Sequence, residues 1–291
     1  MQHFSLRDIE HLTGIKAHTF RMWEQRYGLH LCKRKKSLHR YYDDEDLKQI
    51  LCIAHLYANG YRISRIAHLG LEELRALAAG KEDGSGNALP VQHLIDAVRD
   101  YDAPRFEKML DACIRNMGME DCVTKLIYPL MNRIGLLWMT GSLLPAHEHL
   151  CSCLVRQKIL AAIDRLAAPG DQQGAVILLF TPPGEDHELP LLLAQYVFRK
   201  NGRRTVFFGS NTTPALLHYF CDHRPATHLY VHLITNFTGQ EPEEYVSMLR
   251  DQFPGKTIVA AGRAFSQMPP VAGDVHILRS LKEMQAFAKE S

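Results

Sequence analysis

The sequence lacks any apolar run of the roughly 18 residues that a membrane-spanning helix needs. Its first residues, MQHFSLRD, have none of the regions of a secretory signal peptide. Cysteine is sparse and without pattern, since the 291 residues contain seven, an odd number. These absences argue against a membrane protein and against a disulfide-stabilised secreted domain. We therefore expect a cytoplasmic protein with reduced thiols.

The net charge of the chain is also small, but its charged residues are unevenly distributed. The chain has a formal net charge of +2, whereas its first 42 residues contain nine lysines and arginines against three acidic residues. A basic end on an acidic remainder is typical of proteins that bind nucleic acid through that end alone. A hydrophobic fraction of 46% is ordinary for globular proteins, and the length of 291 residues predicts about two or three domains.

The basic end shows the pattern of two short helices. Residues 6–12 and 16–26 are predicted helices, joined by a tight turn at Gly14. The second helix carries Phe20 and Trp23 at an inward-facing spacing. Its opposite face carries polar side chains: His18, Thr19, Arg21 and Gln25. This is the helix-turn-helix arrangement, in which the second helix enters the major groove of DNA.

A strongly basic segment, residues 29–42, follows, and helices are predicted at 45–59 and 63–68. The motifs TFRMWEQRYG and RYY, in this order of elements, are similar to the MerR family of winged helix-turn-helix transcription regulators over residues 3–68. The resemblance implies a sequence-specific regulator that binds a double-stranded DNA operator. Such regulators bind repeated half-sites, so we expect a homodimer or a higher homo-oligomer.

The residues that we expect at the DNA fall into two groups. His18, Thr19 and Arg21 are predicted to face the major groove, where base edges are read. The others are predicted to contact phosphates, which position the protein: Lys16, Tyr27, Arg34, Lys35, Arg40 and Tyr41. Whether the bound regulator activates or represses is not encoded in these residues.

The remainder of the chain divides by composition and periodicity. The regulator head would occupy residues 1–79, and a charged, glycine-rich segment at 80–88 predicts a linker. Residues 89–168 show the pattern of a four-helix bundle. Residues 174–291 alternate short β-branched runs with helices, which predicts an α/β doubly wound, Rossmann-like parallel sheet. The bundle helices are predicted at 91–101, 103–116, 120–139 and 145–166.

The loop after the first predicted strand, TPPGEDHELP, places a histidine among carboxylates. His187 is suited to coordinating a metal, with Glu185 orienting its other ring nitrogen. With the bundle, this loop resembles the cobalamin-binding module of corrinoid proteins and, more closely, that of MerR-type repressors of carotenoid synthesis genes. The resemblance implies adenosylcobalamin as cofactor and His187 as the axial ligand of its cobalt. It also implies a W-x9-E-H signature in the helical cap: Trp138, Glu148 and His149.

Several positions depart from that module. Pro190 stands where the module has a glycine beside the nucleotide tail of the cofactor. Val231 replaces a serine that faces the lower base, and Ala261 replaces the first of two glycines. Met139 stands where the light-sensing members have a histidine. Two interpretations stay open: cobalamin binds with an altered tail channel, or the module has lost it and serves oligomerisation or another ligand.

Three alternatives concern single residues and the class of protein. Trp138 and His149 are also explained as core residues that hold the bundle to the sheet. Cys151 and Cys153 fall on different faces of a helix, which favours plain thiols over metal ligands. A corrinoid-carrying enzyme subunit is the third alternative, but no acid–base constellation lies beyond residues 185–188. We expect a regulator without enzymatic activity.

Overall fold

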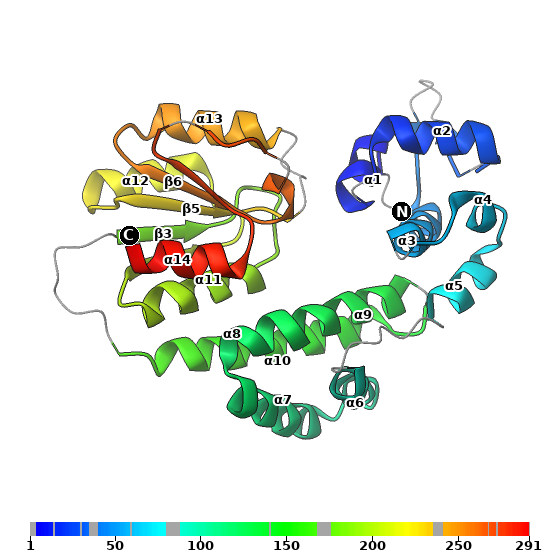
Figure 1. Ribbon diagram of the computed structural model, residues 1–291, viewed down its shortest axis with the longest axis horizontal. Coiled ribbons are helices and arrows are strands. Elements are labelled where there is room, and N and C mark those ends of the chain that lie inside the picture. Colours follow the sequence, from blue (N-terminus) through cyan, green and yellow to red (C-terminus); the bar gives the residue numbers. More distant parts are fainter. Residues whose placement is uncertain are drawn as a thin grey trace. The chain divides into compact units, whose positions relative to one another are not determined.

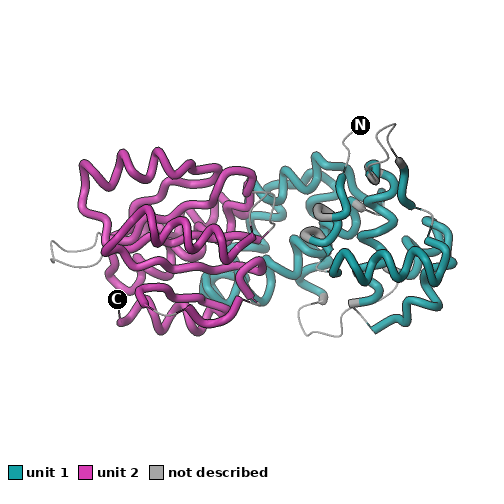
Figure 2. The backbone as a smooth tube through the Cα atoms, turned by 90° about the horizontal axis from the view of Figure 1, so that it is seen from above, with its two compact units in different colours: residues 1–154 teal, residues 155–291 magenta. Residues whose placement is uncertain are grey.

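The structure of the chain, a computed structural model, divides into two compact units, residues 1–154 and 155–291 (Figure 2). No helix among the described residues is long and apolar enough to cross a membrane. The predicted linker at 80–88 lies outside the described residues except for Ala88, and the predicted four-part division stays a prediction. The structure describes residues 4–13, 15–29, 31–34, 40–58, 60–79, 88–139, 141–167, 176–234, 241–266, 268–271 and 273–290.

The first two helices confirm the helix-turn-helix pattern. Helix α1 spans Leu6–Thr13 and α2 spans Ala17–Tyr27, each within one residue of its predicted bounds. The Glu10 Oε2 accepts a hydrogen bond from the Ala17 backbone N–H at 2.9 Å. This bond satisfies one of the amides that the first turn of a helix leaves without a helical partner. Gly28 ends α2 with a φ of 67°, a conformation that glycine adopts without strain.

The basic segment forms a two-stranded antiparallel ribbon of β1 (Lys33–Arg34) and β2 (Arg40–Tyr41). The Lys33 Nζ is hydrogen-bonded to Asp43 and lies 3.0 Å from Asp46. The Asp43 bond, more than any other contact, raises the pKa of Lys33 above its ordinary value. This lysine therefore joins the ribbon to the following helix, and its charge is matched by two carboxylates.

Three helices complete the head: α3 (Asp44–Ala58), α4 (Ile63–Ile66) and α5 (Leu71–Ala79). The predicted helix at 63–68 ends at Ile66, and α5 was not predicted. The Glu73 Oε2 accepts from the Gly70 backbone N–H at 2.8 Å, which caps the start of α5. A glutamate three residues after a helix start is a recognised capping signal, so the sequence did contain evidence for this helix.

Aromatic contacts hold the head together. The Phe20 ring lies edge-on to Tyr42 with the centroids 5.9 Å apart, and the Trp23 ring lies 4.7 Å from that of Tyr57. Phe20, Trp23 and Tyr42 belong to a buried apolar cluster built on α1, α2 and α3, whereas Tyr57 is exposed. Leu136, from helix α9, is a buried member of the same cluster. The core of the head therefore extends into the helical region that follows it.

The helical region is built of α6 (Ala88–Arg99), α7 (Ala103–Met117), α8 (Met119–Cys122), α9 (Tyr128–Met139) and α10 (Pro145–Asp164). The helix predicted at 120–139 is interrupted, because a π-helical turn at Val123–Ile127 separates α8 from α9. The two helices still run in one line (Figure 1). The helical bundle is thus confirmed, with one break inside it.

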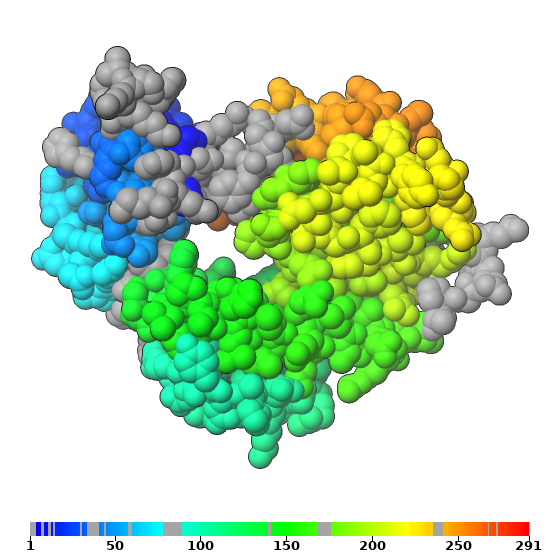
Figure 3. Space-filling model, turned by 180° about the vertical axis from the view of Figure 1, so that it is seen from behind, coloured from blue at the N-terminus to red at the C-terminus, as the bar shows by residue number. Residues whose placement is uncertain are grey.

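Five parallel strands in the order β4-β3-β5-β6-β7 form the sheet of the second unit. Helices α11 and α14 cover one face, and α12 and α13 cover the other (Figure 1), which confirms the doubly wound fold. Helix α12 lies at the surface, in yellow (Figure 3). The bounds are β3 Val176–Phe180, α11 Leu189–Lys200, β4 Arg204–Gly209, α12 Pro214–His223, β5 His228–His232, α13 Pro242–Gln252, β6 Thr257–Ala261, β7 Val275–Leu278 and α14 Leu281–Glu290.

The strand order changes direction between β3 and β5. From β3 the chain steps to β4 on one side, and from β5 it proceeds to β6 and β7 on the other. Ligands of open α/β sheets bind over the carboxyl ends of the strands at such a switch point. Residues 181–188, the loop that contains His187, follow the carboxyl end of β3. The fold thus places the predicted ligand loop where such sheets bind ligands.

Candidate functional site

The outer face of α2 presents exposed side chains in one row. His18, Arg21 and Gln25 are exposed, and their spacing of three and four residues puts them on one side of the helix. Thr19 is half-buried, with its Oγ1 3.4 Å from the His18 Nδ1. Met22 is exposed on the same face. Our sequence analysis missed Met22, although it follows His18 by four residues.

Two residues predicted to contact phosphate lie at the ends of α2. Lys16 is exposed before the first turn, and its Nζ forms an ion pair with Glu10 at 3.1 Å. Tyr27 is half-buried in the last turn, and the Arg26 guanidinium lies 5.6 Å from the centre of its ring. Both ends of the helix therefore carry a cation beside the row of exposed side chains.

The other predicted phosphate contacts lie on the ribbon. Arg34 and Arg40 are opposite each other in the β1–β2 register, and Tyr41 is half-buried beside them. Only the backbone of these two arginines is described, and Lys35 lies outside the described residues. The ribbon is thus confirmed as an element, while the DNA contacts of its side chains stay predictions.

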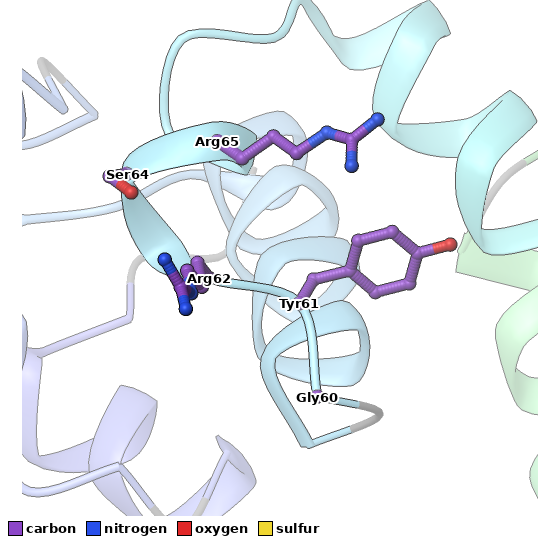
Figure 4. A pocket seen from close by; sticks show the side chains of 5 residues that line it. All are labelled: Gly60, Tyr61, Arg62, Ser64 and Arg65. Carbon is purple, nitrogen blue, oxygen red and sulfur yellow. The ribbon is translucent and has the colours of Figure 1, made fainter.

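A pocket of about 410 Å³ on the head was not anticipated. Arg62 and Arg65 line it together with Tyr61 and Ser64, and all four side chains come from α4 and the segment before it (Figure 4). Both arginines are exposed. Our sequence analysis predicted a helix at 63–68 here and assigned it no ligand, although arginine and serine side chains are common phosphate contacts.

The ligand loop in the second unit is organised by a buried carboxylate. Glu185 is fully buried. Its Oε1 accepts hydrogen bonds from the His187 Nδ1 and, at 3.1 Å, from the His187 backbone N–H. Its Oε2 accepts from the Ile234 backbone N–H at 2.7 Å, after β5. The His187 side chain is 52% exposed. The predicted pair is therefore brought together, with the imidazole held through Nδ1.

A second histidine, His232, lies near Glu185 and His187 and was not part of any predicted site. His232, at the end of β5, is buried, and its Nδ1 lies 3.2 Å from the Tyr230 hydroxyl. Burial lowers the pKa of His232 to about 4, while the charge of the neighbouring Glu185 raises it and that of His187 lowers it. His232 is consequently neutral at physiological pH.

The cap signature residues lie on α9 and α10 of the first unit. Trp138 and His149 are exposed, and Glu148 is half-buried. The histidine that serves packing is His147, which stacks on Tyr101 at 4.4 Å between ring centroids. Trp138 and His149 are thus not buried within the helical region, and their role as packing residues toward the sheet stays a prediction.

The two cysteines of α10 differ in environment. Cys151 is buried, with its Sγ 3.8 Å from the Met131 sulfur, and burial raises the pKa of its thiol. Cys153 is exposed. Within the described part of the chain no three histidine, cysteine or acidic side chains gather as a metal site. The two cysteines are not assembled into such a site.

Known proteins match both halves of this arrangement. The model for the MerR HTH family regulatory protein matches residues 4–72, and the model for the B12 binding domain matches residues 91–162. The HTH-type transcriptional repressor CarH of Myxococcus xanthus is 31% identical over 207 residues, which cover 68% of each chain. The repressor CarA of the same organism is 28% identical over 284 residues, or 95% of this chain and 88% of CarA.

The chain belongs to the MerR-type family of CarH and CarA. It is a DNA-binding transcription regulator that joins a helix-turn-helix head to a B12 binding domain, which confirms the resemblances seen in the sequence. The monomethylamine corrinoid protein of Methanosarcina barkeri has a similar fold, with a TM-score of 0.54 over 70% of this chain and 99% of that protein. At 14% identity this likeness shows the fold alone.

The donor set of the ligand loop fits a corrinoid. Because Nδ1 of His187 is bonded to Glu185, coordination of cobalt would use Nε2 on the other side of the ring. A carboxylate on the second nitrogen fixes the orientation of a ligating imidazole and makes it a better donor. Glu185 is itself held by two backbone amides, those of His187 and Ile234. These two side chains would hold the metal end of the cofactor.

The positions that depart from the module are explained by packing within the chain. Pro190 occupies the first turn of α11, where a proline costs no helical hydrogen bond. Val231 is buried in the apolar cluster between the sheet and the helices α12 and α13. Ala261 is buried at the end of β6. A Cβ on Gly262 would lie 2.3 Å from the Leu233 carbonyl oxygen, so only glycine fits there. The side chain of Met139 lies outside the described residues.

Proposed function

We propose that the regulator controls transcription from a DNA operator in response to a corrinoid coordinated by His187. The hydrogen bond between the buried Glu185 carboxylate and the His187 Nδ1 carries this proposal. A bound cobalamin would supply a cobalt centre, and the His187 imidazole is the side chain that would hold it. The chain supplies the oriented imidazole, and Trp138, Glu148 and His149 are the cap residues that we assign to the same cofactor.

The DNA-binding head would act on transcription by binding the operator. We propose that His18, Thr19 and Arg21 contact base edges in the major groove of an operator in double-stranded DNA. The cationic groups around them would contact phosphates, and the pocket at Arg62 and Arg65 extends that set. Helix-turn-helix proteins bind half-sites about one helical turn apart as dimers, so we propose a homodimer or a higher homo-oligomer on the operator. We propose that this regulator acts in the cytoplasm.

The cofactor part is tested by co-elution. Purified protein is mixed with adenosylcobalamin in the dark and passed through a gel-filtration column, while corrin absorbance is recorded across the protein peak. We expect corrin absorbance with wild-type protein and its loss in His187→Ala. His223→Ala, an exposed histidine at the end of α12, is the matched control and should bind as wild type does. A wild-type peak without corrin absorbance would contradict the proposal.

A second candidate is a regulator whose B12 domain no longer takes the cofactor. The burial of Pro190, Val231 and Ala261 favours it, because the tail positions are then ordinary core. In that case operator binding is the same with and without adenosylcobalamin, and the domain serves oligomerisation or another ligand. Fluorescence anisotropy of a labelled operator, titrated with and without adenosylcobalamin, separates the two candidates.

We further propose that the body acts as a sensor and not as a methyl-carrying enzyme subunit. The relatives CarH and CarA are named as transcriptional repressors, and the head matches the MerR model over residues 4–72. A corrinoid enzyme subunit would bind DNA weakly and without sequence preference. Binding of a natural operator at least about a thousandfold tighter than of a scrambled duplex would be the behaviour of a regulator.

A further inference from the structure

A second loop holds the segment that carries His187. This loop, residues 209–213, connects β4 to α12. The Thr181 backbone N–H donates to the Gly209 carbonyl at 3.0 Å, and the Thr212 N–H donates to the Thr181 carbonyl at 2.9 Å. The β3–β4 register shifts before Phe180, which lies opposite Gly209. Such irregularities re-aim the chain next to functional sites, and here the shift sets the two loops side by side.

Asn211 makes three of the contacts between the loops. Its Oδ1 accepts from the Gly184 backbone N–H at 2.7 Å, and its Nδ2 donates to the Asp186 carboxylate. Its backbone N–H donates to the Thr181 Oγ1 at 3.2 Å. That hydroxyl in turn donates to the Glu185 carbonyl at 2.5 Å. Asn211 therefore bonds directly to the residues immediately before and after Glu185, and it reaches Glu185 itself only through the Thr181 hydroxyl.

The backbone of Asn211 explains the choice of asparagine only in part, because asparagine tolerates the left-handed region better than most side chains but glycine tolerates it better still. Its φ of 57° lies in the left-handed region, which glycine adopts more easily than any residue with a side chain. Among the described residues, Tyr101 is the other non-glycine residue with a positive φ. Glycine at position 211 would keep the turn and lose both side-chain bonds. The side-chain amide, with one acceptor and one donor, is what the loop uses.

We propose that Asn211 is a positioning residue for the axial imidazole of His187. It clamps Gly184 and Asp186 on either side of Glu185, and thereby fixes the backbone from which the Glu185 carboxylate reaches the His187 Nδ1. Without the clamp the loop samples other conformations, and the fraction of protein with the imidazole ready to coordinate falls. This inference rests on the proposed coordination of a corrinoid by His187.

Two variants and one control test the clamp. Asn211→Gly keeps the left-handed turn and removes both amide bonds. Asn211→Asp keeps an acceptor for the Gly184 N–H but sets a carboxylate against Asp186, where like charges repel. Asn201→Gly is the matched control, because the Asn201 amide donates to the Val197 carbonyl at the far end of α11, at 2.8 Å.

The readout is the nitrogen bound to cobalt. The full chain is prepared with 15N-labelled histidine and mixed with cob(II)alamin, and the electron paramagnetic resonance spectrum is recorded. A labelled imidazole splits each cobalt line into a doublet, whereas the unlabelled base of the cofactor splits it into a triplet. We expect the doublet with wild type and Asn201→Gly. With Asn211→Gly we expect an apparent affinity lower by on the order of tenfold and partial loss of the doublet, and with Asn211→Asp a larger loss.

The outcomes separate the two proposals. A wild-type sample without the doublet removes His187 as axial ligand, and the role of Asn211 falls with it. A doublet of equal strength and affinity in wild type and in Asn211→Gly overturns the positioning role and leaves the proposed function standing. Weakening in Asn211→Gly that Asn201→Gly does not share supports the clamp. Rescue of the doublet by Asn211→Gln, which carries the same amide, would add to that support.

Discussion

Leu136 and Trp138 point to opposite sides of α9, Leu136 into the core of the DNA-binding head and Trp138 to solvent. Leu136 is 2% exposed and belongs to the apolar cluster of the head, whereas Trp138 is 39% exposed. Residues two apart on a helix do not share a face, so both orientations follow from one helix. Trp138 is also the first residue of the cap signature. The same helical turn therefore carries a core residue of the head and the first residue of the cap signature.

Replacing Leu136 should destabilise the head. We expect Leu136→Ala to lower the free energy of unfolding by about 2–5 kcal/mol, because a buried leucine leaves a cavity in a packed core. Urea unfolding followed by tryptophan fluorescence, to which Trp23 of the same cluster contributes, measures this loss. Leu89→Ala removes a leucine that is largely exposed and should change stability by less than about 0.5 kcal/mol. Equal effects of the two substitutions would show that Leu136 is not part of the core.

Replacing Arg21 and Arg62 should separate base recognition from phosphate binding. We expect Arg21→Ala to weaken operator binding by about 1–3 kcal/mol and to reduce the preference over a scrambled duplex, because a contact to a base edge is lost. Arg62→Ala should weaken both duplexes alike and lower the dependence on salt, as we also predict for Lys35→Ala. Fluorescence anisotropy at several salt concentrations measures both. Lys48→Ala serves as the control, because the Lys48 side chain pairs with Glu45 on the same helix, α3. An unchanged operator preference in Arg21→Ala removes that residue from the readout.

Two glycines with positive φ should respond differently to alanine. Gly255 has a φ of 76° and open space around the site of a Cβ, so Gly255→Ala should cost roughly 1–2 kcal/mol from backbone strain alone. At Gly262 the Cβ would also overlap the Leu233 carbonyl, and we expect a cost of about 3–5 kcal/mol. Urea unfolding followed by circular dichroism measures the difference. Similar costs at both positions would mean that β5 can move away from β6.

Buried His232 should make the second unit less stable in acid. Its folded pKa of about 4 lies below the ordinary value of 6.5, so between these values the unfolded chain binds a proton that the folded chain does not. The free energy of unfolding therefore falls as pH is lowered through this window, by about 2 kcal/mol between pH 7 and pH 5. In His232→Gln the free energy of unfolding should fall by about 2 kcal/mol less over the same pH interval, whatever its value at pH 7. The groups facing His232 are Tyr230, Glu185 and His187. Parallel losses in both proteins would contradict a neutral, buried His232.

The local sequence determined most of the elements, because helices and strands follow periodicities that neighbouring residues set. The spacing of Phe20 and Trp23 was sufficient to predict α2, and the β-branched runs were sufficient to predict the five strands. The motifs around Trp23, Trp138 and His187 were sufficient for the two family resemblances, since each joins several residues at fixed spacing. The sequence analysis missed helix α5 and the π-helical turn at Val123–Ile127. The capping residue Glu73 was a signal from which α5 could have been predicted.

The tertiary structure decided which side chains meet. It paired Lys33 with Asp43 and Asp46, buried His147 while exposing His149, and brought Leu136 into the core of the head. It also set Asn211 against a loop 25 or more residues earlier in the chain. Contacts at such separations depend on strand order and register, and no spacing in the sequence encodes these. The binding residue His187 and the Glu185 carboxylate that orients it were therefore visible in the sequence, whereas the Asn211 side chain that holds their loop was not.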